Sequence, residues 1–243
     1  FGDAARDVKY FQFMAKDNVP FHTVGFPITL LGVGEPWKLV DHIKGFNWLQ
    51  YYGGKFSTSQ RRGVFMDRAL AEFPADYYRY WLLANSPEGS DSNFTWPAFV
   101  QQVNKDLADV LGNFVNRTLK FCEARFGGIV PSGGKETALE QQLFVDVSNL
   151  VASLTDNCYK LNIRKAQTDL RALWVRGNSY LNEAAPWTRA KTDSSQAAVS
   201  VRTAINLIRL YAVVSLPAIP NISSRILDYI NVPSDPAWPP TES

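Results

Sequence analysis

Apolar residues recur at helical spacing through the second half of the chain. From Thr95, read as an N-cap with Pro97 in the first turn, to the Gly127-Gly128 pair, this spacing predicts one helix of about eight turns. Further amphipathic segments separated by short connections predict helices over residues 135–156, 162–184 and 195–216. Such a succession favours an antiparallel helical bundle.

The first part of the chain has a different pattern. Residues 8–14 are rich in aromatic and β-branched side chains and predict a buried strand, followed by polar residues at the end where open α/β sheets bind ligands. Residues 19–31 predict a short helix despite Pro27, and residues 65–73 and 77–84 predict two more. A parallel strand needs βαβ neighbours, so we expect half of an α/β domain that belongs to a longer protein.

Composition narrows the class of protein only a little. The 243 residues are 46% hydrophobic and 20% charged, enough for one large or two smaller globular domains. A net charge of +2 does not require a nucleic-acid partner, although a local basic surface would suffice for one. We find no run of about 18 apolar residues and no signal peptide, and we expect no membrane and a cytoplasmic location. Cys122 and Cys158 predict two reduced thiols and no metal site.

The stretch from Gly53 to Gly63 holds the most concentrated candidate chemistry. Flexible glycines, three hydroxyls and three cations lie together in a short segment, which is how a mobile loop presents donors to phosphate oxygens. An ordinary basic turn between a strand and a helix has the same composition. The two interpretations remain open at this point.

Several motifs in the same order resemble the methionyl-tRNA synthetases, a family of class I aminoacyl-tRNA synthetases. They are residues 13–23, 55–59, 83–88, 94–96, 111–117 and 185–191, within a resemblance that covers roughly residues 8 to 230. The resemblance implies an α/β plus all-α fold: the C-terminal half of a Rossmann-type catalytic domain over residues 1–94, then an antiparallel α-helical anticodon-binding bundle over 95–232. We expect the proline-rich tail, residues 233–243, to be extended or loosely attached.

This family activates methionine with ATP, used with Mg²⁺ as a substrate complex, and transfers the methionyl group to its tRNA. The resemblance aligns the loop with the Lys-Met-Ser-Lys-Ser signature and implies catalytic roles for Lys55, Ser57, Thr58 and Ser59. It implies ATP contacts for Lys16, Asp17, Thr58, Arg61 and Arg62. Thr58 replaces the second lysine of the signature, and we hypothesise that Arg61 or Arg62 supplies the missing cation.

Two further sets of residues follow from the resemblance. Phe21, His22 and Phe26 match the methionine side-chain pocket, with Phe26 where some members carry tryptophan. Asn113, Arg117 and Trp187 match anticodon-contacting residues, which suits the stacking and base-edge contacts that single-stranded RNA requires. Without the resemblance, His22 fits a packed core or turn histidine, and Trp187 fits a plug at the end of the bundle.

The chain lacks the His-Ile-Gly-His-type signature of a complete class I synthetase, since His22 and His42 are its two histidines. We therefore expect the missing N-terminal half as a partner, paired along the strand at 8–14, besides methionine tRNA, methionine and ATP. We expect the chain alone to be inactive. The alternatives are a tRNA-binding module that has lost catalysis and a purely structural interaction protein.

Overall fold

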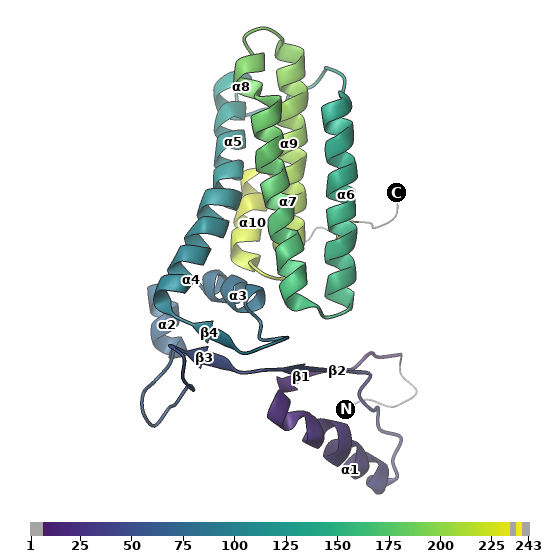
Figure 1. Cartoon of the computed structure of the whole chain (residues 1–243). Helices are drawn as coiled ribbons and strands as arrows, with labels where there is room; N and C mark the ends of the chain where they lie inside the picture. Colours follow the sequence, from purple (N-terminus) through teal and green to yellow (C-terminus); the bar gives the residue numbers. More distant parts are fainter. Residues whose placement is uncertain (1–6, 234–236, 240–243) are drawn as a thin grey trace. The chain divides into compact units, whose positions relative to one another are not determined.

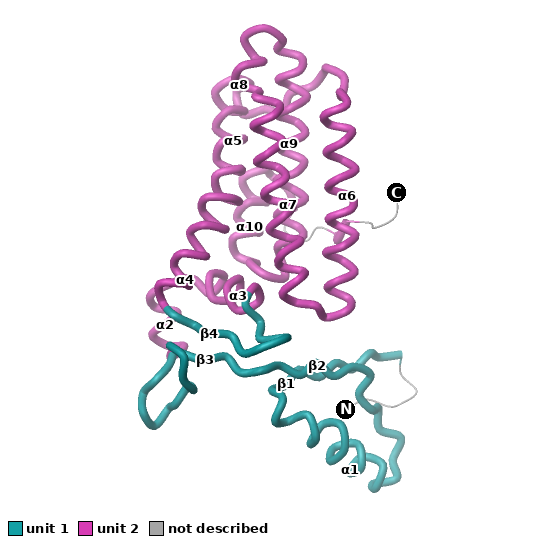
Figure 2. The backbone as a smooth tube through the Cα atoms, viewed as in Figure 1, with its two compact units in different colours: residues 1–63, 85–95 teal, residues 64–84, 96–243 magenta. Residues whose placement is uncertain are grey.

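A computed structural model describes residues 7–233 and 237–239, which form two compact units (Figure 2). Unit 1 comprises the described residues up to Gly63 together with Asn85–Thr95, and unit 2 comprises Val64–Ala84 and the described residues from Trp96 onward. Residues 64–84 thus pack with the helical unit, whereas the sequence pattern grouped them with the first domain. The predicted domain boundary after residue 94 stays a prediction.

Unit 1 contains two small parallel sheets. Strand β1 (Phe11–Ala15) pairs with β2 (His42–Phe46), and β3 (Leu49–Tyr51) pairs with β4 (Ser92–Phe94). The strand predicted at 8–14 is therefore present, but it begins three residues later and ends at Ala15. The predicted burial is wrong for most of it, since Met14 is buried while Phe11 and Phe13 are exposed. Strands β2, β3 and β4 were not predicted as strands, and β3 and β4, with three residues each, are too short to show an alternation of apolar and polar positions.

The helical segment after β1 uses three kinds of winding. A 3₁₀ turn, Lys16–Asn18, leads through a π-helical turn, Phe21–Gly25, into α1 (Phe26–Val33). Pro27 is the second residue of α1 and directly follows the π-helical turn, so the predicted helix continues through Pro27 with a change of winding beside it. Gly34, with φ of 76°, ends the helix.

Unit 2 is helical, and its long helices lie side by side (Figure 1). The four predicted bundle helices are all present within a few residues. Helix α8 lies in the connection between the predicted helices 162–184 and 195–216, and neither α8 nor α10 was predicted. The helices are α2 (Met66–Glu72), α3 (Ala75–Ala84), α4 (Trp96–Val103), α5 (Asn113–Phe126), α6 (Ala138–Tyr159), α7 (Ile163–Ala184), α8 (Pro186–Arg189), α9 (Ser194–Ser215) and α10 (Pro220–Tyr229).

Helices α4 and α5 are joined without a break by a π-helical segment, Asn104–Gly112. The predicted single helix from Trp96 to Phe126 is therefore continuous, but it is not α-helical throughout. Within it, the backbone N–H of Asn113 donates to the carbonyls of Ala108 and Val110 as the α winding resumes. A wider winding in mid-helix often marks a functional position.

The core of unit 2 is built from large side chains without measurable exposure. Trp174 and Tyr180 from α7, Phe114 from α5 and Tyr211 from α9 meet in it, and the Phe114 and Tyr211 rings lie 5.3 Å apart. Helix α9 is long and apolar enough to cross a membrane by length and composition, a feature that our search for apolar runs did not detect. Its position explains this composition, because 78% of its most apolar window is buried in the bundle.

Both cysteines are unpaired, as predicted, with Cys122 buried and Cys158 exposed. Residues 234–236 and 240–243 of the predicted tail lie outside the described residues. Within the tail, the indole N–H of Trp238 donates to the Thr155 hydroxyl of α6 at 3.0 Å, so this point of the tail contacts the bundle.

Helix α6 begins at a capping box that the sequence pattern missed. The Thr137 hydroxyl accepts from the N–H of Leu139, while the carboxylate of Glu140 accepts from the backbone N–H of Thr137 at 2.9 Å. Glu140 is fully buried, and its other oxygen accepts from the Tyr180 hydroxyl at 2.7 Å. Burial raises the pKa of Glu140, but the hydrogen bonds from Thr137 and Tyr180 outweigh burial and hold that pKa below its ordinary value.

We predict that Glu140→Gln lowers the free energy of unfolding by about 2 kcal/mol at pH 7, because a charge-assisted acceptor is lost. A carboxyl group with a lowered folded-state pKa stabilises the fold above its ordinary pKa and loses this effect as the pH falls through the folded-state value. The difference between wild type and variant in denaturant titrations should therefore shrink on acidification. The exposed Glu136→Gln is the control, and an equal effect of the two variants contradicts the prediction.

Candidate functional site

The Gly53–Gly63 loop follows β3 and is held by its own backbone. Ser57 and Arg62 exchange two N–H to carbonyl hydrogen bonds of 2.8 Å, and the Arg61 N–H donates to the Thr58 carbonyl at 3.1 Å across the tip. The Ser57 hydroxyl accepts from the N–H of Gln60 and lies 3.2 Å from the Ser59 hydroxyl. The loop is thus a short hairpin with its hydroxyls gathered near the tip.

Arg62 braces the base of this hairpin. Its guanidinium donates to the carbonyls of Tyr51 and Tyr52 at 2.9 and 3.3 Å. A Cβ at Gly54 would overlap this guanidinium, and a Cβ at Gly63 would meet the Phe56 ring, so a larger residue at either position would displace one of these side chains. Arg62 therefore holds the loop, and its charge is directed toward backbone oxygens.

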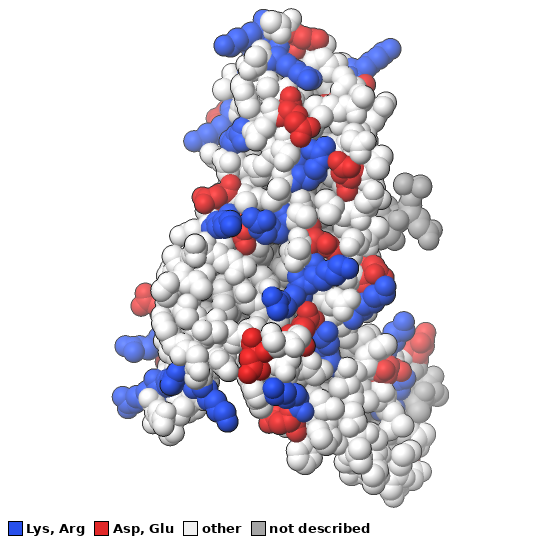
Figure 3. All heavy atoms as spheres, in the orientation of Figure 1, with Lys and Arg blue, Asp and Glu red and all other residues white. Residues whose placement is uncertain are grey.

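Lys55 and Arg61 remain as the outward cations of the loop. Both are exposed, and among the described residues neither side chain makes a hydrogen bond or ion pair. Arg61 has φ of 48°, a strained conformation for a residue with a Cβ, and such conformations concentrate at ligand clamps. Figure 3 shows basic side chains on this projecting loop, whereas acidic and basic groups alternate over the visible face of the bundle.

The polar residues after β1 divide into an anchored lysine and a free aspartate. The Lys16 ammonium donates to Asn47 Oδ1 at 3.2 Å, lies 3.6 Å from the Asp91 carboxylate, and sits 5.7 Å from the Trp48 ring centroid. Asp17 is exposed and makes no hydrogen bond with the described residues. No sequence signal connects Lys16 to Asn47 or Asp91, because Asn47 follows β2 and Asp91 precedes β4, both far along the chain.

The three predicted pocket residues lie on consecutive turns after β1. Phe21 is 68% exposed, His22 is half-buried, and Phe26 begins α1. The Nδ1 atom of His22 lies 3.0 Å from Oε1 of Gln12, whose amide in turn donates to the Tyr10 hydroxyl. His22 is thus oriented from β1 by Gln12, and the large exposed ring of Phe21 is available to another surface.

At the other candidate surface, the structure brings Arg117 and Trp187 into contact. The Arg117 guanidinium lies over the Trp187 ring at 4.7 Å from its centroid and donates to Asn182 Oδ1 at 3.1 Å. The Trp187 side chain is 37% exposed at the start of α8, so it is not a buried plug. Asn182 was not predicted, because no sequence signal connects it to Arg117.

Asn113 lies one turn before Arg117 on α5. It is exposed and lines an open hollow of about 370 Å³ together with Asp109, Gly112 and Asn116, at the point where the π-helical segment ends. Asn113 and Arg117 therefore lie on one face of α5, and the contact between Arg117 and Trp187 brings α8 to the same part of the unit.

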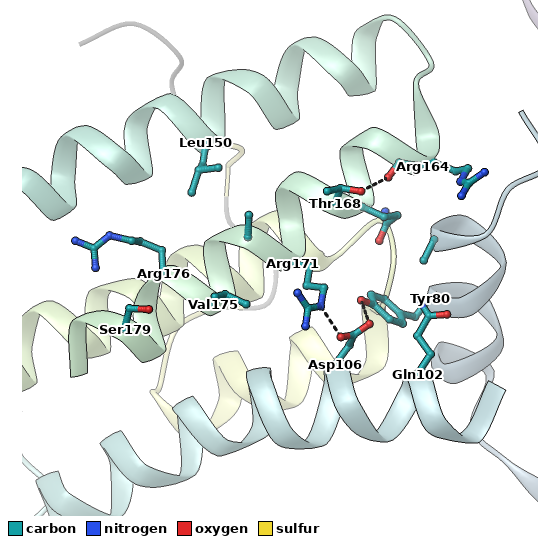
Figure 4. A pocket seen from close by; sticks show the side chains of 13 residues that line it. Tyr80, Gln102, Asp106, Leu150, Arg164, Thr168, Arg171, Val175, Arg176 and Ser179 are labelled. Atoms are coloured by element: carbon teal, nitrogen blue, oxygen red, sulfur yellow. Dashed lines mark hydrogen bonds and ion pairs between the residues drawn. The ribbon is translucent and has the colours of Figure 1, made fainter. Parts of the chain in front are cut away.

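A cavity of about 470 Å³ lies near the other end of α7, between α3, the π-helical segment and α6 (Figure 4). The buried Asp106 carboxylate accepts from the Tyr80 hydroxyl at 3.0 Å and from Arg171 Nε at 2.5 Å. Burial, with the nearby Asp106 charge, raises the pKa of Tyr80, so this hydroxyl remains a donor. Since Arg171 is committed to Asp106, we assign this network to joining helices.

No group of three or more acidic, histidine or cysteine side chains suited to a metal ion occurs in the part of the chain that the structure describes. The expectation that this portion holds no metal site remains a prediction.

Two family models match the chain. One, described as tRNA synthetases class I (M), matches residues 1–119, and the other, described as the anticodon binding domain of methionyl tRNA ligase, matches residues 130–243.

Individual proteins agree with these models. The methionine–tRNA ligase of Caulobacter sp. strain K31 is 56% identical over 241 residues, which are 99% of this chain and 42% of that protein. The methionine–tRNA ligase of Ruegeria pomeroyi is 56% identical over 235 residues, 97% of this chain and 41% of that protein. The structure of Mycobacterium tuberculosis methionyl-tRNA synthetase in complex with methionyl-adenylate superimposes with a TM-score of 0.81 at 25% identity, covering 92% of this chain and 44% of that one. The chain thus spans about two fifths of the length of these relatives.

The hairpin geometry predicts that Arg62 protects the base of the loop from local opening. Arg62→Ala removes the brace on the Tyr51 and Tyr52 carbonyls, so the Gly54 N–H, which donates to the Tyr51 carbonyl at 3.2 Å, should exchange about tenfold faster in hydrogen-exchange measurements. Arg61→Ala is the matched control and should leave this exchange rate unchanged. Equal protection of Gly54 in wild type and Arg62→Ala would show that the brace has no effect.

Proposed function

The chain belongs to the methionyl-tRNA synthetases of class I, and on this basis we propose that it forms part of a methionine–tRNA ligase. In this proposal it contributes the phosphate-handling loop, part of the methionine pocket and the anticodon-contacting surface. The observation that carries the proposal is that one chain combines a projecting cationic loop with an exposed Trp187–Arg117 stack. A binding module without catalysis, the alternative, would have no use for the loop or for Phe21 and His22.

The loop handles the triphosphate of ATP, which enters with Mg²⁺ as a substrate complex. The methionine carboxylate attacks the α-phosphorus, the adenylate forms, and pyrophosphate leaves. Lys55 and the hydroxyls of Ser57, Thr58 and Ser59 donate to phosphate oxygens, and contacts that strengthen in the transition state accelerate the step. Asp17 accepts from ATP hydroxyls beside Lys16, since its carboxylate is exposed and free to do so.

Arg61 supplies the cation that the signature loses at Thr58. Arg62 is directed to the carbonyls of Tyr51 and Tyr52, so its ATP contact, which the sequence implied, is replaced by a bracing role. Arg61 is exposed at the tip, one hydrogen bond across the turn from Thr58. Its guanidinium can therefore reach outward to phosphate without first breaking a contact in the loop.

The methionine side chain packs against Phe21 and Phe26, with His22 as the polar group beside the sulfur. A thioether is apolar and polarizable, which suits aromatic walls. Gln12 supports this role because its Oε1, 3.0 Å from His22 Nδ1, orients the ring, and the other ring nitrogen is left to face the ligand.

The tRNA anticodon binds across α5 and α8. A base stacks on Trp187, whose ring is held by the Arg117 guanidinium on one side, while Asn113 meets a base edge. Asn182 keeps Arg117 in place by accepting its hydrogen bond at 3.1 Å. The reaction takes place in the cytoplasm, which agrees with two unpaired cysteines.

The remaining polypeptide of the synthetase covers the apolar surface of β1 and α1. Phe13, Ile28 and Leu31 are each more than half exposed there, and β1 pairs on one side with β2. A surface of this kind in contact with water is unfavourable, and the matched relatives are more than twice as long as this chain. Activity measurements therefore require the full-length protein.

We predict that Arg61→Ala lowers the rate constant of methionine-dependent pyrophosphate exchange by about a hundredfold, the usual effect of losing one transition-state donor. Thr58→Lys in the Arg61→Ala background should restore part of this rate, because it returns the cation to its usual place. The exposed Arg68→Ala, on α2, is the control. An unchanged exchange rate in Arg61→Ala would remove Arg61 from the mechanism.

We predict that Trp187→Ala raises the KM for methionine tRNA in aminoacylation by about tenfold, since one base stack contributes about 1–3 kcal/mol. Pyrophosphate exchange should not change, because it does not involve tRNA. Trp238→Ala is a matched control, since both tryptophans are 37% exposed. If the two variants have the same tRNA KM, the anticodon assignment of Trp187 is wrong.

A further inference from the structure

We propose that Asn178 of α7 is a positioning residue that sets the orientation of the anticodon-contacting face by holding the π-helical segment Asn104–Gly112. This inference rests on the proposed function, because it deepens the role of Asn113 and Arg117. The hydrogen bonds of the Asn178 side chain go to Val110 and Trp174, and not to the predicted anticodon-contacting residues.

The first argument comes from the spacing of buried residues along the continuous helix. Phe99, Val103, Leu107, Leu111 and Val115 are all buried and follow one another at intervals of four. In an α-helix of 3.6 residues per turn, such a series turns about 160° around the axis from first to last. The wider winding of the π-helical segment offsets this rotation, so these five side chains can share the buried face.

The winding also decides which way the following residues point. Asn113 is the first residue of α5, and its exposed side chain lines the hollow at the end of the π-helical segment. If the segment reverted to α winding while Phe99 and Val103 stayed buried, Asn113 and Arg117 would rotate away from Asn182 and Trp187. The contact surface therefore depends on the π winding being kept.

Asn178 holds the point where the π winding ends. Its side-chain amide donates to the Val110 carbonyl at 2.9 Å and to the Trp174 carbonyl at 3.0 Å. The same Val110 carbonyl accepts from the backbone N–H of Asn113. One carbonyl thus links α7 directly to the first residue of the contact face.

Two further observations indicate that the π-helical segment depends on the residue types at positions 178 and 112. The Oδ1 atom of Asn178 is buried and makes no hydrogen bond with the described residues, so the side chain is kept here for its donor despite an unpaired acceptor. Gly112 lies next to Asn113, and a Cβ there would come within 3.0 Å of the Leu107 carbonyl oxygen. A side chain at Gly112 would therefore require the Leu107 carbonyl of the π-wound turn to shift by a few tenths of an ångström.

The test measures aminoacylation and pyrophosphate exchange by the full-length protein carrying Asn178→Ala or, separately, Gly112→Ala. We expect the KM for methionine tRNA to rise about tenfold in both variants, while the KM for methionine and for ATP in exchange stays within about twofold. Gly112→Ala keeps the test decisive if Asn178→Ala does not fold. An unchanged tRNA KM in every variant that folds overturns the inference.

Two matched controls separate positioning from a general loss of stability. Asn157→Ala also removes a buried side-chain amide that joins two helices. This amide donates to Ser153 of α6 and to Asp169 of α7, and neither hydrogen bond involves α5 or the π-helical segment. Gly89→Ala adds a Cβ to a glycine of unit 1 with open space around it. Neither should change the tRNA KM, and a rise in Asn157→Ala as large as in Asn178→Ala overturns the inference.

A double-mutant cycle measures whether the effects on the tRNA KM are coupled, and a general loss of stability would not produce such coupling. If Asn178 acts through Asn113 and Arg117, then Asn178→Ala should have little further effect on the tRNA KM in a background that carries both Asn113→Ala and Arg117→Ala, whereas additive effects would overturn the inference. The proposed function fails separately: Trp187→Ala with unchanged tRNA KM refutes the anticodon surface itself. A raised KM in Trp187→Ala with no change in Asn178→Ala refutes only the positioning role.

Discussion

One helix, from Trp96 to Phe126, has to bury side chains at intervals of four while it keeps a polar face outward, and the bundle depends on how it does so. Regular α winding cannot meet both requirements over this length, because a four-residue repeat drifts around the axis. The wider winding at Asn104–Gly112 removes the conflict and leaves Phe114 in the core, 5.3 Å from Tyr211. Packing of the other helices against this side fixes where α8, with Trp187, can lie.

In unit 1, backbone carbonyls likewise fix the position of a side chain, here the charged guanidinium of Arg62. Arg62 donates to two carbonyls at the base of the loop, and a neighbouring glycine gives its guanidinium room. The two adjacent arginines therefore have different positions: Arg62 holds the base of the loop, and Arg61 lies exposed at its tip. A loop that is stiff at its base and charged at its tip suits a ligand that arrives as a polyanion.

The two candidate surfaces differ in how far their side chains are already in contact within this chain. Trp187 and Arg117 already contact each other, and Asn182 fixes the cation, so this surface is arranged before any base arrives. Around Phe21 and α1, by contrast, large apolar side chains are exposed with β1 next to them. In our proposal the methionine pocket is completed by the rest of a polypeptide of which this chain matches about two fifths.

The sequence by itself determined the long bundle helices and the order of motifs, because apolar periodicity and short signatures are local properties of the chain. It correctly placed α7, and it placed Asn113 and Arg117 four residues apart on one helix. It missed α10, the short strands β2, β3 and β4 and the Thr137–Glu140 capping box, where the local signals are short.

Only the tertiary structure decided which groups meet. The separation of Arg61 from Arg62 depends on carbonyls of Tyr51 and Tyr52, and the partners Asn182 and Asn178 come from a helix more than sixty residues further along the chain. The π winding, too, results from competition between burial and regular hydrogen bonding along one helix. Contacts between distant residues and the balance of competing energies leave no local pattern in a single sequence, and for this reason they became visible only in the fold.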